Sequence, residues 1–148
     1  MAPNVRSITH RVRNFIRRKQ MRREINPSNF PEPQSNYSQG VVHDASAARM
    51  VISGQVGVRP DGSIAEGLDA QMQQTWDNFL AVLKTAGFDK ADVVKVTLFT
   101  TVPALQEFRR GREQALAGHA PAATYVQVAG LADPDFLVEI EGEAVKAS

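Results

Sequence analysis

Three carboxylates lie in a row near the C-terminal end of the sequence and are the first candidates for chemistry. The stretch DFLVEIEGEAV, residues 135–145, alternates strictly, so an extended strand would place Glu139, Glu141 and Glu143 on one face and apolar or small residues on the other. A carboxylate on a partly dry sheet face can position or deprotonate a water molecule. The alternative, which the residues alone favour, is that these acids are solvated or paired with Lys95 and nearby arginines.

The composition excludes several other kinds of site. The 148 residues include no cysteine, which excludes disulfides, thiolate catalysis and zinc–sulfur sites. His10, His43 and His119 are scattered and show no metal-ligand spacing. The sequence GQVGV has two glycines and no following helix, so it is not a dinucleotide-binding fingerprint. We therefore expect no metal and no cofactor, and no apolar run approaches membrane-spanning length.

Charge is distributed unevenly along the chain. Residues 1–23 hold eight Lys or Arg and no acid, and the remainder holds nine basic and sixteen acidic residues, which gives +8 and −7 for a net charge of +1. The basic segment fits an organelle presequence, an arm for nucleic acid or anionic lipid, or a bland extension ahead of Met21. We favour the bland extension and hence a cytoplasmic protein, with the presequence as the open alternative.

The chain divides into three segments. Residues 1–25 form the basic extension, and residues 26–36 carry three prolines without periodicity and are typical of a linker. Residues 37–148 are long enough for one domain with its own core.

Apolar periodicity within this domain predicts five strands and two helices. The strands are expected at 37–42, 48–58, 92–101, 122–131 and 135–145, and the helices at 66–86 and 103–118. The order ββαβαββ contains two βαβ-type crossovers, which place both helices on one face of a single mixed sheet in a two-layer α+β fold.

The second face of this sheet is expected to be mixed in character. Too polar for a core yet partly apolar, such a face is typical of a subunit interface or of a site wall. The residues expected there are Val51, Ser53, Gln55, Lys95, Thr97, Phe99, Ala123, Tyr125, Gln127, Glu139 and Glu141.

Several segments, in this order and at this spacing, resemble the RidA/YjgF (UK114) family, which is also described as endoribonuclease L-PSP-like. They are NYSQGVV, MVISGQVGVRPDGS, QMQQTWDNFLAVLKTAG, DVVKVTLFTT and PAATYVQVAGLADPDFLVEIEGEAV, and the resemblance covers roughly residues 36–146. It implies a chorismate mutase-like fold that assembles as a homotrimer, with a central barrel of sheets and ligand clefts between subunits. It also implies hydrolysis of reactive enamines and imines to keto acids and ammonia, without a cofactor.

The resemblance assigns expected roles to particular residues. Tyr37 matches the cleft tyrosine of the family, and Ser53 and Gly54 match the strand end that lines the cleft, where a glycine lets a ligand approach the backbone. Glu139 matches the glutamate that positions the attacking water. Ala123 and Thr124 also fall in the motif that contributes to the substrate site.

The sequence departs from the family at the residue expected to bind the substrate carboxylate. Ala123 stands where the deaminase pattern has arginine, and Tyr125 stands where the family often has cysteine. A guanidinium binds a carboxylate through two charge-assisted hydrogen bonds, and losing such a contact typically costs about a hundredfold in affinity. Arg112, where the family often has a cleft-facing asparagine, is a candidate replacement. The residues alone slightly favour the alternative that Arg112 lies on a solvated helix face.

Three functional hypotheses follow. The first is a trimeric hydrolase of the deaminase type that acts through Glu139 on a small metabolite, with a substrate altered by Ala123. The second is a trimer that binds a small ligand without turnover. The third is RNA binding, which rests only on residues 1–23 because the compact domain is acidic.

Overall fold

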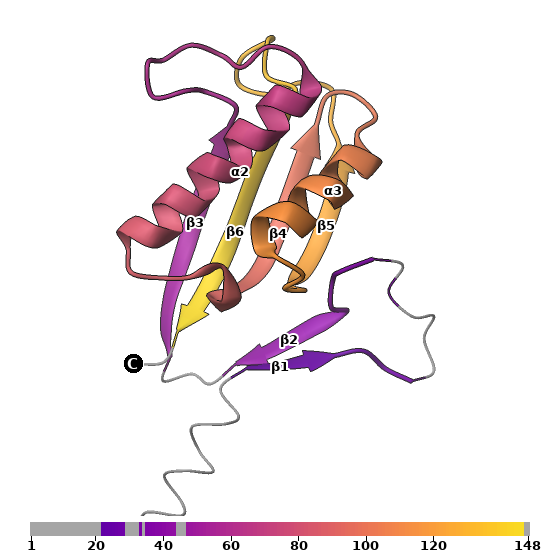
Figure 1. Ribbon diagram of the computed structural model, residues 1–148. Helices are drawn as coiled ribbons and strands as arrows, with labels where there is room; N and C mark the ends of the chain where they lie inside the picture. The colour runs from indigo at the N-terminus through magenta and orange to yellow at the C-terminus, as the bar shows by residue number, and fades with distance from the viewer. Residues whose placement is uncertain (1–21, 29–32, 34, 44–46, 147–148) are drawn as a thin grey trace, which may run out of the picture.

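The domain is built around one twisted sheet covered by two helices. A computed structural model describes residues 22–28, 33, 35–43 and 47–146 (Figure 1), so the expected basic helix before residue 22 lies outside the described residues. The elements are β1 (Arg22–Ile25), β2 (Gly40–His43), β3 (Ala48–Val56), α2 (Leu68–Thr85), the short 3₁₀ helix η1 (Lys90–Asp92), β4 (Val93–Thr100), α3 (Leu105–Leu116), β5 (Ala122–Gln127) and β6 (Val138–Lys146).

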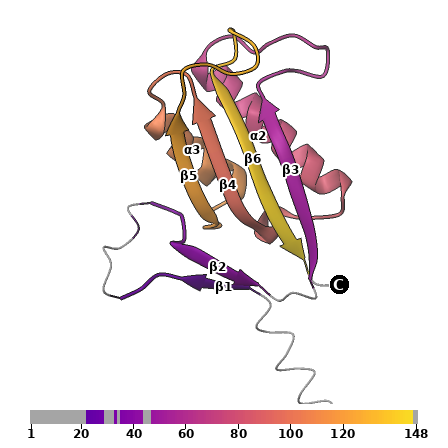
Figure 2. The same cartoon turned by 180° about the vertical axis from the view of Figure 1, so that it is seen from behind.

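The main sheet has four strands in the order β3-β6-β4-β5. The pair β4–β5 is parallel, whereas β6 is antiparallel to both of its neighbours, β3 and β4. Both helices lie on the same face of this sheet, and the opposite face carries no helix (Figures 1 and 2). The expected two-layer α+β fold with a mixed sheet is confirmed.

The core forms where the helical stripes meet the inner face of the sheet. On α2 the predicted stripe runs through Met72, Trp76, Phe79 and Leu83, each at most 3% exposed. These residues recur every three or four positions, so they occupy one side of the helix. Gly87 ends this helix with a φ of 76°, a conformation that glycine adopts without steric cost.

The N-terminal strand pairs differently from the expectation. The sequence placed the strand at 37–42 in the main sheet, but β2 pairs in antiparallel fashion with β1 in a separate two-stranded sheet. Strand β1 falls within residues 1–25, which were interpreted as an extension. Alternation along one segment does not reveal its pairing partner, because pairing depends on distant residues. The segment before β2 still reaches the main sheet, since Ser38 N donates to Pro121 O at 3.0 Å.

A β-bulge in β3 changes which residues reach the second face of the sheet. The register shifts between Ile52, which pairs with Gly142, and Gln55, which pairs with Ile140. The extra residue reverses the alternation, so Gln55 lies with the helix-facing positions, contrary to the expectation. Beyond the bulge, Val56 pairs with Glu139.

Within the described residues, no helix has the length and apolar character needed to cross a membrane.

Close packing at Gly142 leads to a stability prediction. A Cβ at this position would lie 2.6 Å from the backbone oxygen of Lys95 and 2.9 Å from the Phe79 ring. We expect Gly142→Ala to lower the free energy of unfolding in urea by about 1–3 kcal/mol through overpacking. Gly130→Ala is the control, because a Cβ there would meet nothing within 4 Å. Equal stability of the two variants would contradict this packing.

Candidate functional site

Glu139 lies on the uncovered face of the sheet, directly beside the bulge of β3. On β6 it pairs with Val56 of β3 and with Phe99 of β4. A Cβ at Gly54 would lie 2.6 Å from Glu139 Cδ, so the carboxyl group extends across the glycine backbone. Ser53 is exposed next to it. The structure therefore brings together Ser53, Gly54 and Glu139, which we call the strand half-site.

Two amide side chains, one buried and one partly buried, hold the strands of this half-site in place. Gln71 on α2 is 3% exposed; its Nε2 donates to Asp135 O and its Oε1 accepts from Leu137 N, both at 2.8 Å. These bonds fix the entry into β6 just before Glu139. Asn78 Nδ2 donates to the carbonyls of Val56 and Val58, each at 2.9 Å, and holds the end of β3. Amide side chains whose hydrogen bonds are satisfied in this way make the backbone rigid.

The two other acids of the row are in different surroundings. Glu143 forms an ion pair with Arg49, with 2.8 Å between Oε2 and Nη2, as the structural interpretation of the row anticipated. Glu141 is exposed. Lys95 Nζ donates to Thr124 Oγ1 at 2.5 Å, and partial burial lowers the pKa of Lys95 although Glu141 and Glu143 oppose the shift.

The structure places Ala123 and Tyr125 on the helix-facing side of β5, which corrects the expectation that they share a face with Glu139. In the parallel register they pair with Val96 and Leu98, both fully buried. Gln127, which pairs with Thr100, occupies a position on the same helix-facing side of β5. The small residues at the start of β5 carry no clear alternation, so the sequence did not fix which side faced inward.

The side chain of Tyr125 is held by contacts within the chain. Its hydroxyl accepts hydrogen bonds from Thr100 Oγ1 at 3.0 Å and from the backbone N–H of Ala104 at 2.9 Å. Its ring stacks on Phe108, with centroids 6.1 Å apart and planes at 27°. Tyr125 therefore ties the start of α3 to the sheet.

Arg112 is buried, contrary to the expectation of a solvated helix face. The residue is 3% exposed, and its guanidinium lies 4.9 Å from the centroid of the Phe108 ring. Its Nη2 donates to Ser35 Oγ, whereas Nε is buried without a hydrogen-bond partner. Burial lowers the pKa of Arg112, Arg109 lowers it further, and the neighbouring Glu113 and Tyr37 oppose the shift.

Three further residues that the sequence assigned to the substrate site, Tyr37, Arg112 and Ala123, lie on or beside α3 and β5, and we call them the helix half-site. Tyr37 precedes Ser38, whose bridge to Ala122 holds this segment against the edge of β5. Ala123 packs against the core that contains Phe108. Strand β4 separates β5 from β6 (Figure 2), so within one chain the two half-sites do not meet. Thr124 points to the uncovered face and belongs to neither.

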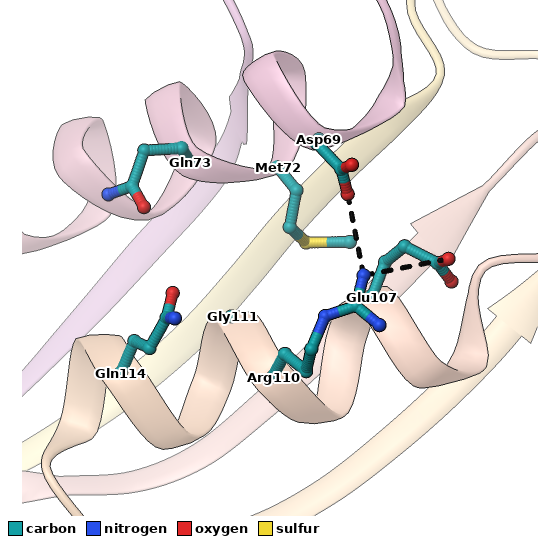
Figure 3. A pocket seen from close by; sticks show the side chains of 7 residues that line it. All are labelled: Asp69, Met72, Gln73, Glu107, Arg110, Gly111 and Gln114. Carbon is teal, nitrogen blue, oxygen red and sulfur yellow. Dashed lines mark ion pairs between the residues drawn. The ribbon is translucent and has the colours of Figure 1, made fainter.

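A pocket of about 240 Å³ lies between the two helices and contains no residue of either half-site. It is lined by Asp69, Met72, Gln73, Glu107, Arg110, Gly111 and Gln114 (Figure 3). Arg110 bridges the helices across it, with Nη2 3.6 Å from Asp69 Oδ1 and 3.8 Å from Glu107 Oε1. Among the residues that the structure describes, no group of three or more acids or histidines could hold a metal ion.

Comparison with known proteins agrees with this architecture. The family model described as Endoribonuclease L-PSP matches residues 27–146, most of the chain. The chain belongs to this family. A solved structure with the same fold is that of a protein of unknown function from Yersinia pestis, which is assigned to the conserved Rid family. Its TM-score against this chain is 0.76 and its sequence identity is 32%, and the match covers 85% of this chain and 99% of that one. The resemblance seen in the sequence is confirmed.

Relatives with a named activity are also similar over most of their length. The 2-iminobutanoate/2-iminopropanoate deaminase of Salmonella typhimurium is 34% identical over 134 residues, which is 85% of this chain and 99% of the relative. The human protein of the same name is 30% identical over 131 residues, covering 85% of this chain and 91% of the relative. Proteins named as imine deaminases are thus among those to which the chain is similar over most of its length.

Sequence reasoning missed the surroundings of Arg112. Ser35 and Phe108 were not singled out, although both contact the guanidinium. A signal was present: Phe108, Arg112 and Leu116 recur every four residues, which places the arginine on the same buried side of α3 as the two apolar residues.

The environment of Tyr125 leads to a prediction. Removing its hydroxyl in Tyr125→Phe leaves the Ala104 N–H and the Thr100 hydroxyl without this acceptor, and both residues are at most 1% exposed. We expect a loss of about 1–3 kcal/mol in the free energy of unfolding, measured in urea. A change below about 0.5 kcal/mol, the range of ordinary surface substitutions, would contradict a structural role for this hydroxyl.

Proposed function

We propose that the protein is a cofactor-free hydrolase of imines and enamines, of the deaminase type, with its sites between the subunits of a homotrimer. The observation that carries the proposal is the Glu139 carboxyl group lying across Gly54 on a sheet face without helices. No cation among the described residues forms an ion pair with it, in contrast to Glu143. Family membership and the names of the deaminase relatives support the same reaction class.

The chemistry needs one carboxylate and one water. Glu139 accepts a proton from a water molecule as the oxygen forms a bond to the imine carbon. Glu139 passes this proton to the imine nitrogen, which gives a neutral carbinolamine. The carbinolamine then collapses: its hydroxyl proton passes through Glu139 to the nitrogen, the C–N bond breaks, and ammonia leaves as the carbonyl forms. An enamine enters the same route after protonation at carbon gives the imine. Hydrogen, oxygen and nitrogen balance with water as the only co-reactant.

The trimer is proposed because each chain leaves its chemistry incomplete. The uncovered face carries Val51, which is 70% exposed, together with Phe99 and several polar groups. A face of this mixed character is typical of an interface. A neighbouring copy could complete the strand half-site of one subunit with the helix half-site of the next. Ala123 stands where the deaminase pattern has the arginine that binds the substrate carboxylate. Either the substrate of this protein therefore differs from that of such deaminases, or another cation binds the carboxylate.

Ammonia release tests the reaction. Imines generated in situ from amino acids by an amino acid oxidase should lose ammonia faster in the presence of the protein. We expect Glu139→Gln to lower this rate by about a hundredfold or more, because the base is removed. Glu141→Gln is the matched control, since this acid is on the same strand but exposed. Wild-type rates in the Glu139 variant would eliminate the proposed role.

Subunit mixing tests the shared site. Glu139→Gln and Tyr37→Ala each damage a different half-site, so either variant alone should be inactive. Random mixing of the two in one trimer regenerates intact interfaces at about one site in four, because each site needs one subunit of each kind in the right order. We expect about a quarter of wild-type ammonia release after co-refolding. No recovery, with sedimentation confirming mixed trimers, would place both residues in a site within one chain.

A second candidate is a trimer that binds a small ligand without turnover. The methyl group of Ala123 favours it, because it offers a substrate carboxylate no hydrogen bond. Thermal-shift screening against keto acids and neutral amides, combined with the ammonia assay, separates the two. Stabilisation by a ligand in a protein without turnover of any imine would support the binder.

A further inference from the structure

The pocket between the two helices has the composition of a separate binding site. We propose that it binds a free amino acid in its zwitterionic form, with the ammonium group on the two acids and the carboxylate on Arg110. The pocket contains no residue of either half-site and lies on the opposite side of the sheet from Glu139 (Figure 3). Its volume of about 240 Å³ is just below the roughly 300–1,000 Å³ of pockets for drug-sized ligands, which suits a smaller molecule.

The pocket is formed by facing stripes of two parallel helices. Strands β3 and β4 are both antiparallel to β6, and β4 is parallel to β5, so the crossover helices α2 and α3 run in the same direction. Asp69 and Glu107 each lie in the first turn of their helix, where the helix dipole stabilises negative charge. Figure 3 shows these two acids at one end of the pocket, with Gln73 and Gln114 at the other.

Arg110 is held only loosely by the two acids. Its Nη2 lies 3.6 Å from Asp69 Oδ1 and 3.8 Å from Glu107 Oε1, whereas a charge-assisted hydrogen bond measures about 2.7–2.9 Å. Neither the guanidinium donors nor the carboxylate acceptors are therefore used up in this bridge. An anion alone would also meet the acids, and a cation alone would also meet Arg110. A ligand with both charges finds a partner for each, and complementary charge of this kind gives specificity.

The floor of the pocket is apolar and adaptable. Met72 lines it although this residue is 3% exposed, and an unbranched thioether side chain adjusts to different shapes. Beside it, a Cβ at Gly111 would lie 2.9 Å from Trp76 Nε1 and 3.0 Å from Met72 Cγ. The indole N–H of Trp76 is buried directly behind this floor and has no hydrogen-bond partner among the described residues. Because an unpaired buried donor is costly, an oxygen of a ligand that reached it would add to binding.

Calorimetry on the full chain tests the class of ligand. The probe is L-2-aminobutanoate, and the matched controls are butanoate, which lacks the ammonium group, and propylamine, which lacks the carboxylate. We expect a dissociation constant in the millimolar range or below for the amino acid. Both controls should bind about tenfold more weakly or worse, because each loses one charge-assisted contact. Equal binding of either control would overturn the zwitterion assignment.

Substitutions in the pocket test where the probe binds. Arg110→Met and Asp69→Asn each remove one charge from a side chain that is 60% or 85% exposed, so the fold should be unaffected. We expect each to bind the amino acid about tenfold more weakly. Lys84→Met is the matched control, because it removes an exposed cation of α2 that does not line the pocket. Wild-type affinity in Arg110→Met, or no heat of binding from wild type at millimolar probe, would contradict the proposal.

The Glu139→Gln variant distinguishes this pocket from the proposed hydrolase site. It should bind the amino acid as tightly as wild type while releasing no ammonia. Loss of binding in Glu139→Gln, with full binding in Arg110→Met, would place the probe on the sheet and overturn the proposal without affecting the hydrolase. If wild type releases no ammonia from any imine but Arg110→Met still loses the probe, the hydrolase proposal fails and the pocket between the helices stands.

Discussion

The four-stranded sheet buries only one of its faces within a single chain, because both crossovers carry their helices to the same side. Side chains alternate between the two faces of a strand, so each strand contributes half of its residues to the core and half to an uncovered surface. The core takes Ile52, Val96, Leu98 and Ile140, each at most 2% exposed. What remains outside is a face that combines apolar side chains with acids, and the position of Glu139 follows from this division.

The bulge in β3 gives this surface its local shape. Without the register shift between Ile52 and Gln55, Gly54 would fall with the core-facing residues. With it, a glycine comes to lie beneath a carboxylate, and the missing Cβ leaves room for the Glu139 side chain to extend across the backbone. Bulges often reorient side chains next to functional sites. Here the effect is to separate Glu139 from its two neighbours in the row, one paired with Arg49 and the other solvated.

The helix side of β5 carries a buried cation among aromatic side chains. The stack from Tyr125 through Phe108 to Arg112 connects sheet and helix with aromatic faces and ends in a guanidinium. Burial lowers the pKa of Arg112, and the neighbouring Glu113 opposes this shift, so part of the cost of burying the charge is offset within the chain.

The sequence alone determined the two helices, the strands of the main sheet and the family. The stripes of α2, the alternation of β4 and β6 and the two crossovers are local patterns, and they predicted the layers correctly because burial follows the 3.6 and 2 periodicities. The alternation of β6 placed Glu139, Glu141 and Glu143 on one face, and only the family resemblance distinguished Glu139 from the other two. Tertiary structure alone decided the phase of β5, the bulge in β3, the pairing of β2 with β1 and the partners of Arg112. Each of these depends on contacts between segments far apart in the chain, such as Ser35 with Arg112, and no periodicity within one segment encodes which distant partner it meets.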